Sequence, residues 1–176
     1  MRRGDWLDDE DIFKFEKRLQ AKYPHVNGLE NPIIITHMPG SIIKANDFIR
    51  IVHCKRHWIC VKGHEGVVEI YDSLPRSKID KFLGNILKKI ISSNFLNEIT
   101  FKAVIKNVQI QKGENCGFFA LAFAYALCIG LDPEEMHFDE EKIRNHYFDI
   151  IFNNKEMNMF PYTNCQRKKN NEFLNF

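Results

Sequence analysis

The side chains in this chain that could carry out chemistry together are a cysteine, a histidine and an aspartate that lie far apart in the sequence. Cys116 follows the polar segment 111–115 and opens a run, Gly117 to Leu131, that contains no charged side chain. This run predicts a helix buried on all sides, with Cys116 in its first turn. The free backbone amides and the helix dipole at that position favour the thiolate form of a cysteine. The pattern therefore predicts a nucleophile, with a buried structural cysteine as the alternative.

A predicted β-hairpin places a histidine and an aspartate opposite one another. Segments 57–62 and 67–72 are strand-like, and residues 63–66 between them suit a turn. With a symmetric turn, His57 faces Asp72 across the ladder at a Cβ separation of about 4.5–5.5 Å. The shared face is apolar, so the buried helix is expected to pack on it. Its apolar residues are Ile59, Val61, Val68 and Ile70.

Packing the helix on this hairpin would bring a nucleophile, a base and an orienting acid into one cleft. His57 would take the proton of the thiol, and Asp72 would fix the tautomer of the imidazole. A salt bridge at the rim of the sheet is the alternative for this pair. Acyl transfer also needs donors for the oxyanion. The amide of Cys116 is one, and the side-chain amide of Gln111 is the second, with Gln109 as a competing candidate.

The composition restricts the class of protein. The chain has 176 residues, 44% of them hydrophobic, which suits a single catalytic domain whose core spans about residues 5–160. A net charge of +2 with interspersed signs gives no case for nucleic-acid binding. The apolar run is shorter than the about 18 residues that a membrane span needs. Five irregularly spaced cysteines and no signal peptide favour a reducing intracellular compartment, the nucleus or the cytoplasm. We also expect a monomer.

The predicted elements form an α+β domain. Helical patterns begin at about residues 8, 77, 116 and 139, and strand-like patterns cover 48–52, 57–62, 67–72 and 99–108. Ser77 with Asp80 resembles a capping box for the second helix. The segment 29–47 receives no assignment.

A cluster of possible metal ligands occurs around the first predicted strand pair, at His53, Cys54, His57 and Cys60. On a strand the two histidines project to one face and the two cysteines to the other, which prevents a single tetrahedral site unless the segment is a loop. We therefore expect no metal and no organic cofactor.

The order His57-Trp58, Asp72, Gln111 with Gly113, then Cys116-Gly117-Phe118 resembles the ubiquitin-like-protein-specific (SUMO/sentrin-type) cysteine proteases. Adenovirus-type proteases share this arrangement. The segment Trp6-Leu7-Asp8-Asp9 is similar to the Trp-Leu-Asn-Asp segment of that family. The resemblance extends from Trp6 to about Phe160 and implies a papain-like fold. In that fold a central helix bearing the thiol packs on a sheet bearing the imidazole and the carboxylate.

The resemblance also implies a substrate. Trp58 and Trp6 would form a narrow tunnel for the Gly-Gly tail of a ubiquitin-like modifier, and Asp9 would contact that modifier. The expected activity is that of a peptidase or isopeptidase with a Cys-His-Asp triad. Two alternatives remain, an acyltransferase on the same scaffold and a non-catalytic module that binds a modifier.

The sequence departs from the family pattern in three respects. Asn115 stands where the family usually has an aspartate, and the loop from Gln111 to Cys116 is one residue shorter than is common. The chain is also compact, in the manner of protease-like domains carried by mobile elements. The identity of the modifier therefore stays open.

Overall fold

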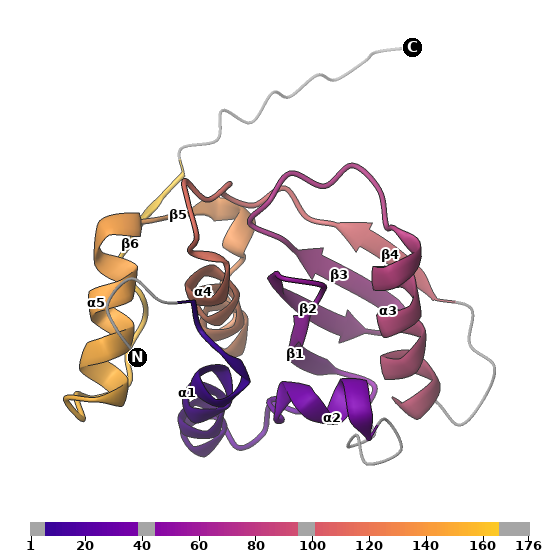
Figure 1. Cartoon of the computed structure of the whole chain (residues 1–176), viewed down its shortest axis with the longest axis horizontal. Helices are drawn as coiled ribbons and strands as arrows, with labels where there is room; N and C mark the ends of the chain where they lie inside the picture. The colour runs from indigo at the N-terminus through magenta and orange to yellow at the C-terminus, as the bar shows by residue number, and fades with distance from the viewer. Residues whose placement is uncertain (1–5, 39–44, 95–100, 166–176) are drawn as a thin grey trace, which may run out of the picture.

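A mixed four-stranded sheet forms the middle of the molecule, with helices on both faces (Figure 1). The computed structural model describes residues 6–38, 45–94 and 101–165. The strands lie in sequence order: β1 (Phe48–His53), β2 (Trp58–His64), β3 (Val67–Tyr71) and β4 (Lys102–Ile105). The first three pair antiparallel, and β4 runs parallel to β3.

The helix α4 (Cys116–Cys128) is the centre of the larger core. Each of its 13 residues except Leu127 is buried, as the uncharged sequence predicts. One face of the sheet, α1 (Asp9–Lys22) and α5 (Glu140–Ile151) enclose it. Because each fully buried phenylalanine contributes about 1.5–3 kcal/mol, this enclosure is a large part of the stability of the fold.

The face of the sheet that receives α4 differs from the predicted one. α4 packs against the face that carries Trp58, Cys60 and Tyr71. The face that was expected to receive it is covered instead by α3 (Lys81–Asn94), and its residues are Ile59, Val61, Val68 and Ile70. The prediction was wrong because both faces of β2 are apolar. A strand buried on both sides does not reveal which helix covers which face.

The register of the hairpin also differs from the predicted one. The structure pairs Cys60 with Tyr71 and His64 with Val67, which leaves a two-residue turn. Glu65 and Gly66 in this turn have φ values of 46° and 78°. Positive φ at both positions is typical of a type I′ turn, whose twist matches that of the strands. The expected direct opposition of His57 and Asp72 is therefore wrong by two residues. They are diagonal neighbours at the ends of their strands.

The predicted helices are present, with differences at their ends. α1 begins with a capping box in which the Asp8 side chain accepts from the amide of Asp11 at 2.9 Å. Asp80 rather than Ser77 caps α3, since its carboxylate accepts from the amide of Leu83 at 2.9 Å. α5 begins directly after Asp139, as expected.

Short elements account for the segments that the sequence left unassigned. α2 (Pro32–His37) lies within the segment 29–47, and the 3₁₀ turn η2 (Pro133–Glu135) follows α4. β5 (Met136–Phe138) and β6 (Tyr162–Asn164) form a second, two-stranded sheet. The strand predicted over 99–108 is β4, and its residues 99–100 lie outside the described part of the chain. Among the described residues, no helix has the length and apolar character to cross a membrane.

The packing of β1 on β2 can be tested by a substitution at Gly63. A Cβ at this position would lie 2.2 Å from the ring of Phe48, its partner in the ladder. We expect Gly63→Ala to lower the free energy of unfolding by about 1–3 kcal/mol, measured by urea denaturation, because the ring must shift. Gly84→Ala is the control, since its Cβ would meet Ile79 at 3.9 Å inside a helix. That variant should be stabilised by about 0.5–1 kcal/mol. Equal stability of the two variants would contradict this account.

Candidate active site

Three side chains from different elements meet at one end of the sheet. Cys116 is the first residue of α4, His57 lies in the turn just before β2, and Asp72 follows directly after β3. The Nε2 atom of His57 is 2.5 Å from Oδ1 of Asp72. The Cys116 side chain lies close enough to the His57 ring to contribute to the raised pKa of His57. Because Nε2 is engaged by the carboxylate, Nδ1 is the nitrogen left for the sulfur. The structure thus brings the three predicted residues together.

The turn and loop around these residues hold them in place. The amide of Cys54 donates to the carbonyl of His57 at 2.7 Å, which closes the turn between β1 and β2. Asp72 accepts from the amide of Leu74 at 2.9 Å, a local bond typical of aspartates at turns. Its second oxygen accepts from Nε of Arg76 at 2.7 Å. Every oxygen of the Asp72 carboxylate therefore has a partner.

The pair of His57 and Asp72 is charged in this environment. Burial lowers the pKa of His57, but the hydrogen bonds to Asp72 and Cys116 outweigh it and raise that pKa to about 9. Burial alone would raise the pKa of Asp72, yet bonds from His57, Leu74 and Arg76 hold it below its ordinary value. Hydrogen bonds to the ionised forms dominate at both residues. At neutral pH the site therefore holds an imidazolium beside a carboxylate.

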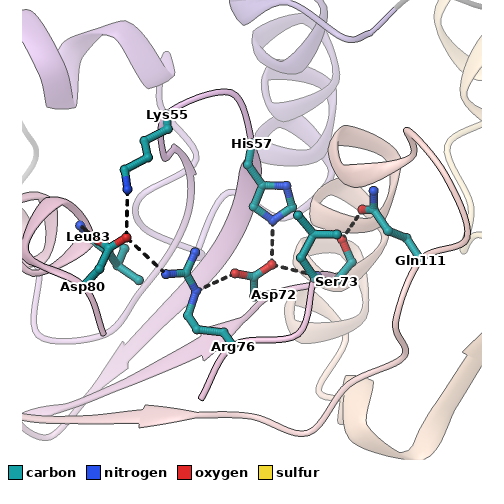
Figure 2. A network of polar contacts seen from close by, with 9 residues as sticks. Lys55, His57, Asp72, Ser73, Arg76, Asp80, Leu83 and Gln111 are labelled. Carbon is teal, nitrogen blue, oxygen red and sulfur yellow. Dashed lines mark hydrogen bonds and ion pairs between the residues drawn. The ribbon is translucent and has the colours of Figure 1, made fainter. Parts of the chain in front are cut away.

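A chain of polar contacts links Asp72 to the start of α3 (Figure 2). The guanidinium of Arg76 lies 4.0 Å from the carboxylate of Asp80. Asp80 in turn accepts from Nζ of Lys55 at 3.1 Å and caps α3. Since Lys55 belongs to the turn that carries His57, the network connects the supports of the base and of the acid.

The two glutamines that competed for the oxyanion role have different partners. The Gln111 side chain accepts from Oγ of Ser73 at 2.6 Å and donates to the carbonyl of Gly113. Ser73 directly follows Asp72, so Gln111 lies next to the site (Figure 2). Gln109 instead bonds both the amide and the carbonyl of Phe138, at 2.6 Å and 3.2 Å. It therefore anchors β5, and Gln111 is the better placed candidate.

Comparison with family models and with curated proteins finds no match, whereas solved structures do match. The SUMO protease Ulp1 with its catalytic cysteine oxidized to a sulfenic acid aligns at a TM-score of 0.67 and 15% identity, over 85% of this chain and 78% of that one. The C-terminal Ulp1 domain in complex with Smt3, the yeast ortholog of SUMO, gives 0.66 and 15%, over 84% and 77%. The chain has the fold of the Ulp1-type SUMO proteases.

The effector XopD of Xanthomonas campestris, solved bound to ubiquitin, has the same fold. It aligns at a TM-score of 0.57 and 13% identity, over 84% of this chain and 92% of that one. These likenesses confirm the predicted α+β, papain-like architecture, with the cysteine-bearing helix packed against a mixed sheet.

In this Ulp1-type fold the N-terminal segment crosses the first turn of α4. Trp58 is buried and its indole donates to the carbonyl of Leu7 at 2.8 Å. The Leu7 side chain packs against Gly117, where an added Cβ would approach it to 3.0 Å. Trp6 is 44% exposed, and its indole donates to the carboxylate of Glu114 at 2.6 Å. Trp58 is thus hydrogen-bonded to the N-terminal segment, and Trp6 in that segment is hydrogen-bonded to the loop before Cys116.

Asp9, the third residue predicted to contact a substrate, is the partly exposed first residue of α1. It lies two positions after Leu7, at the end of the segment that crosses α4. The contact of Asp9 with a modifier stays a prediction.

Three of the other cysteines, Cys54, Cys60 and Cys128, are buried thiols of a different character. Burial raises the pKa of Cys54 and Cys60, and raises that of Cys128 to about 12. Within residues 6–38, 45–94 and 101–165, no group of three or more His, Cys, Asp or Glu side chains could hold a metal ion. A high pKa makes these three thiols poor nucleophiles at neutral pH.

Sequence reasoning missed Ser73 and Arg76, which bond Gln111 and Asp72, and it missed Glu140 and Arg144, which hydrogen-bond to the loop before Cys116. Arg76 follows Asp72 by four residues, and this spacing within a turn was the available signal. Glu140 and Arg144 lie in α5, far from the site in sequence, and no local pattern points to them.

The charge state of His57 can be tested by NMR titration of its ring. Asp72→Asn should lower its pKa from about 9 toward about 6.5 or below, because burial then lacks the opposing carboxylate. Arg76→Gln should raise the same pKa, since it removes a cation near the imidazolium. Shifts of the two variants in the same direction would rule out this electrostatic account.

Proposed function

We propose that this chain is a cysteine peptidase that cleaves after the Gly-Gly-type C-terminus of a ubiquitin-like modifier. The observation that carries the proposal is the position of the His57 ring. Within a Ulp1-type fold it hydrogen-bonds to the Asp72 carboxylate, and the Cys116 side chain lies close enough to contribute to its raised pKa. A nucleophile, a base and an orienting acid in this order form the minimum set for acyl transfer by a thiol.

The reacting form is an ion pair, in which the proton of the Cys116 thiol has already passed to His57 to give a thiolate beside an imidazolium. The thiolate attacks the carbonyl carbon of the Gly–X peptide or Gly–Lys isopeptide bond, and a tetrahedral oxyanion forms. His57 then donates its proton to the leaving nitrogen as the C–N bond breaks, which leaves a thioester on Cys116. Water, deprotonated by His57, attacks the thioester and releases the glycine carboxylate and the free thiol.

The charge distribution of the site supports both proton transfers. An imidazolium with a pKa of about 9 is stable beside a thiolate at neutral pH. Asp72 keeps the ring oriented, and its low pKa means that it stays ionised throughout. The proton therefore resides on the imidazole, from which it reaches the leaving amine.

Gln111 is the proposed second donor to the oxyanion, beside the amide of Cys116. Its side-chain nitrogen now donates to the carbonyl of Gly113 in the same loop. In the reaction it would exchange this acceptor for the substrate oxygen, while Ser73 keeps holding the amide oxygen. Loss of one such donor typically costs roughly 10²–10³ in rate.

The surroundings of Cys116 support a narrow substrate. Trp6 belongs to the segment that covers the first turn of α4, and Trp58 donates to the carbonyl of Leu7 in that segment, so the two rings are the proposed walls of the passage to the sulfur. Glycines suit such a passage because they have no side chain. Ulp1 and XopD have been solved with Smt3 and with ubiquitin, respectively. We propose a related modifier as the partner here, recognised by a monomer in the nucleus or cytoplasm.

Catalysis is tested by Cys116→Ser and His57→Ala. Each should lower kcat/KM by at least about 10³-fold, because loss of a triad member leaves only residual catalysis. The measurement is cleavage of a panel of ubiquitin-like precursors, with circular dichroism to check that the variants fold. Wild-type cleavage by either variant would refute the assignment. Labelling of Cys116 by acetyl-CoA without hydrolysis of any precursor would favour the acyltransferase alternative.

Tail selectivity is tested by Trp6→Ala, since this side chain is partly exposed and its loss should leave the core intact. We expect a higher KM for a Gly-Gly tail and a smaller preference for Gly-Gly over Gly-Ala, because one wall of the passage is gone. Glu114→Gln is the matched control, as its amide oxygen still accepts from the indole. An unchanged preference in Trp6→Ala would contradict the role of this ring.

A further inference from the structure

Hydrogen bonds of Glu140 and Arg144 bind the loop that precedes Cys116 to α5, and we propose that these two residues are positioning residues for the chemistry at Cys116. They hold the side chain of Asn115 away from α4, so that the amides of the first turn stay available to the developing oxyanion. The inference rests on the proposed function, because it concerns the same site. It adds Glu140 and Arg144 to that site, both from α5, a helix that contributes no reacting group.

Asn115 is engaged at both ends of its side-chain amide. Its Oδ1 accepts from Nε of Arg144 at 2.8 Å, and its Nδ2 donates to Oε2 of Glu140 at 3.2 Å. One partner is a donor and the other an acceptor, so the orientation of the amide is fixed. An asparagine satisfies both requirements at once. An aspartate would place a second carboxylate against Glu140.

The direction of this side chain affects the helix that carries the nucleophile. Asn115 is the N-cap of α4, yet its side chain makes no hydrogen bond to the first turn. An asparagine at an N-cap usually accepts from one of these amides. Here the Asn115 side chain does not accept from the amide groups of the first turn, so it does not offset the positive end of the helix dipole. These amide groups remain available to the oxygen anion of the tetrahedral intermediate.

Two further bonds fix the backbone of the loop. The amide of Lys112 donates to Oε2 of Glu140 at 2.9 Å, and Nη2 of Arg144 donates to the carbonyl of Glu114 at 2.8 Å. The guanidinium of Arg144 also lies 4.7 Å from the centre of the Phe118 ring. Phe118 is buried in α4, so the arginine is oriented by the same helix that it serves. The loop is therefore fixed relative to α4 and α5 together.

This arrangement predicts an effect on the chemical step. Gln111 and the amide of Cys116 lie at the two ends of the fixed loop, and their separation sets the geometry around the oxyanion. A displacement of about 1 Å can cost about 10²-fold in rate. Attack of the thiolate on a haloacetamide forms no oxyanion, so that reaction should not depend on the loop. The two reactions of one sulfur therefore separate a positioning role from a general loss of structure.

The experiment compares two rates for each variant. The first is acylation of Cys116, measured as the burst with a modifier C-terminal ester and, separately, with p-nitrophenyl acetate. The second is alkylation of Cys116 by iodoacetamide, followed by mass spectrometry. Because burial raises the pKa of Cys54, Cys60 and Cys128, alkylation at these thiols should be slow. Urea denaturation establishes that each variant is folded.

Asn115→Asp should lower both acylation rates by about 10–100-fold and leave alkylation within about 3-fold of the wild type. Adding Glu140→Gln to this variant should raise acylation again by at least about 3-fold, because the new amide nitrogen can donate to the introduced carboxylate, although it then no longer accepts from the amide of Lys112. Glu140→Gln alone should be near wild type, since its amide oxygen still accepts from Lys112 and Asn115. Arg144→Met should behave like Asn115→Asp. Lys142→Met, which removes a cation of α5 that pairs with Asp139, should have no effect.

Equal acylation by Asn115→Asp with and without Glu140→Gln would overturn the proposal, as would an acylation loss that merely matches the alkylation loss. If Cys116 of the wild type is acylated by p-nitrophenyl acetate but by no modifier ester, the proposed function fails. The acylation rates of the variants with p-nitrophenyl acetate then still test the role of the loop. A wild type that is alkylated at Cys116 but acylated by neither ester overturns both.

Discussion

Enclosure of α4 is the constraint on which the rest of the structure depends. A helix with no charged side chain must be covered along its whole length, and the sheet, α1 and α5 cover it. Its first turn meets the polar loops that carry His57 and Asp72, so the thiol of Cys116 has a defined set of neighbours. His57 and Asp72 come from the loops at that end of the sheet. The burial that stabilises the domain thus also locates its chemistry.

Hydrogen bonds and ion pairs connect the polar groups around the site to one another. His57 and Asp72 are charged because hydrogen bonds outweigh the cost of burial at both. Arg76 continues these contacts to Asp80 at the start of α3. On the other side of the sulfur, Asn115 links the loop to α5. Elements on both faces of the sheet therefore orient groups around one atom, although none of these supports reacts.

The sequence was sufficient for the four long helices, for the strands of the larger sheet and for the three residues that meet, and it failed on the short elements and on pairing details. Apolar periodicity locates α1, α3, α4 and α5 because each buries one stripe or its whole surface. It does not fix the hairpin register, since a shift of two residues keeps every side chain on its face. Nor does it distinguish the two apolar faces of β2. Contacts such as that of Arg144 with Asn115 depend on tertiary packing, which a local pattern does not encode.

The type I′ turn at Glu65 and Gly66 has a practical consequence for work with this domain. It lies at the end of the hairpin opposite His57 and Asp72, about 20 Å away along strands that rise about 3.3 Å per residue. His64 and Glu65 at this tip are exposed. A fluorophore or a surface anchor attached there would leave the sulfur accessible to large conjugates. The hairpin tip is thus a natural handle for immobilising the molecule in a defined orientation.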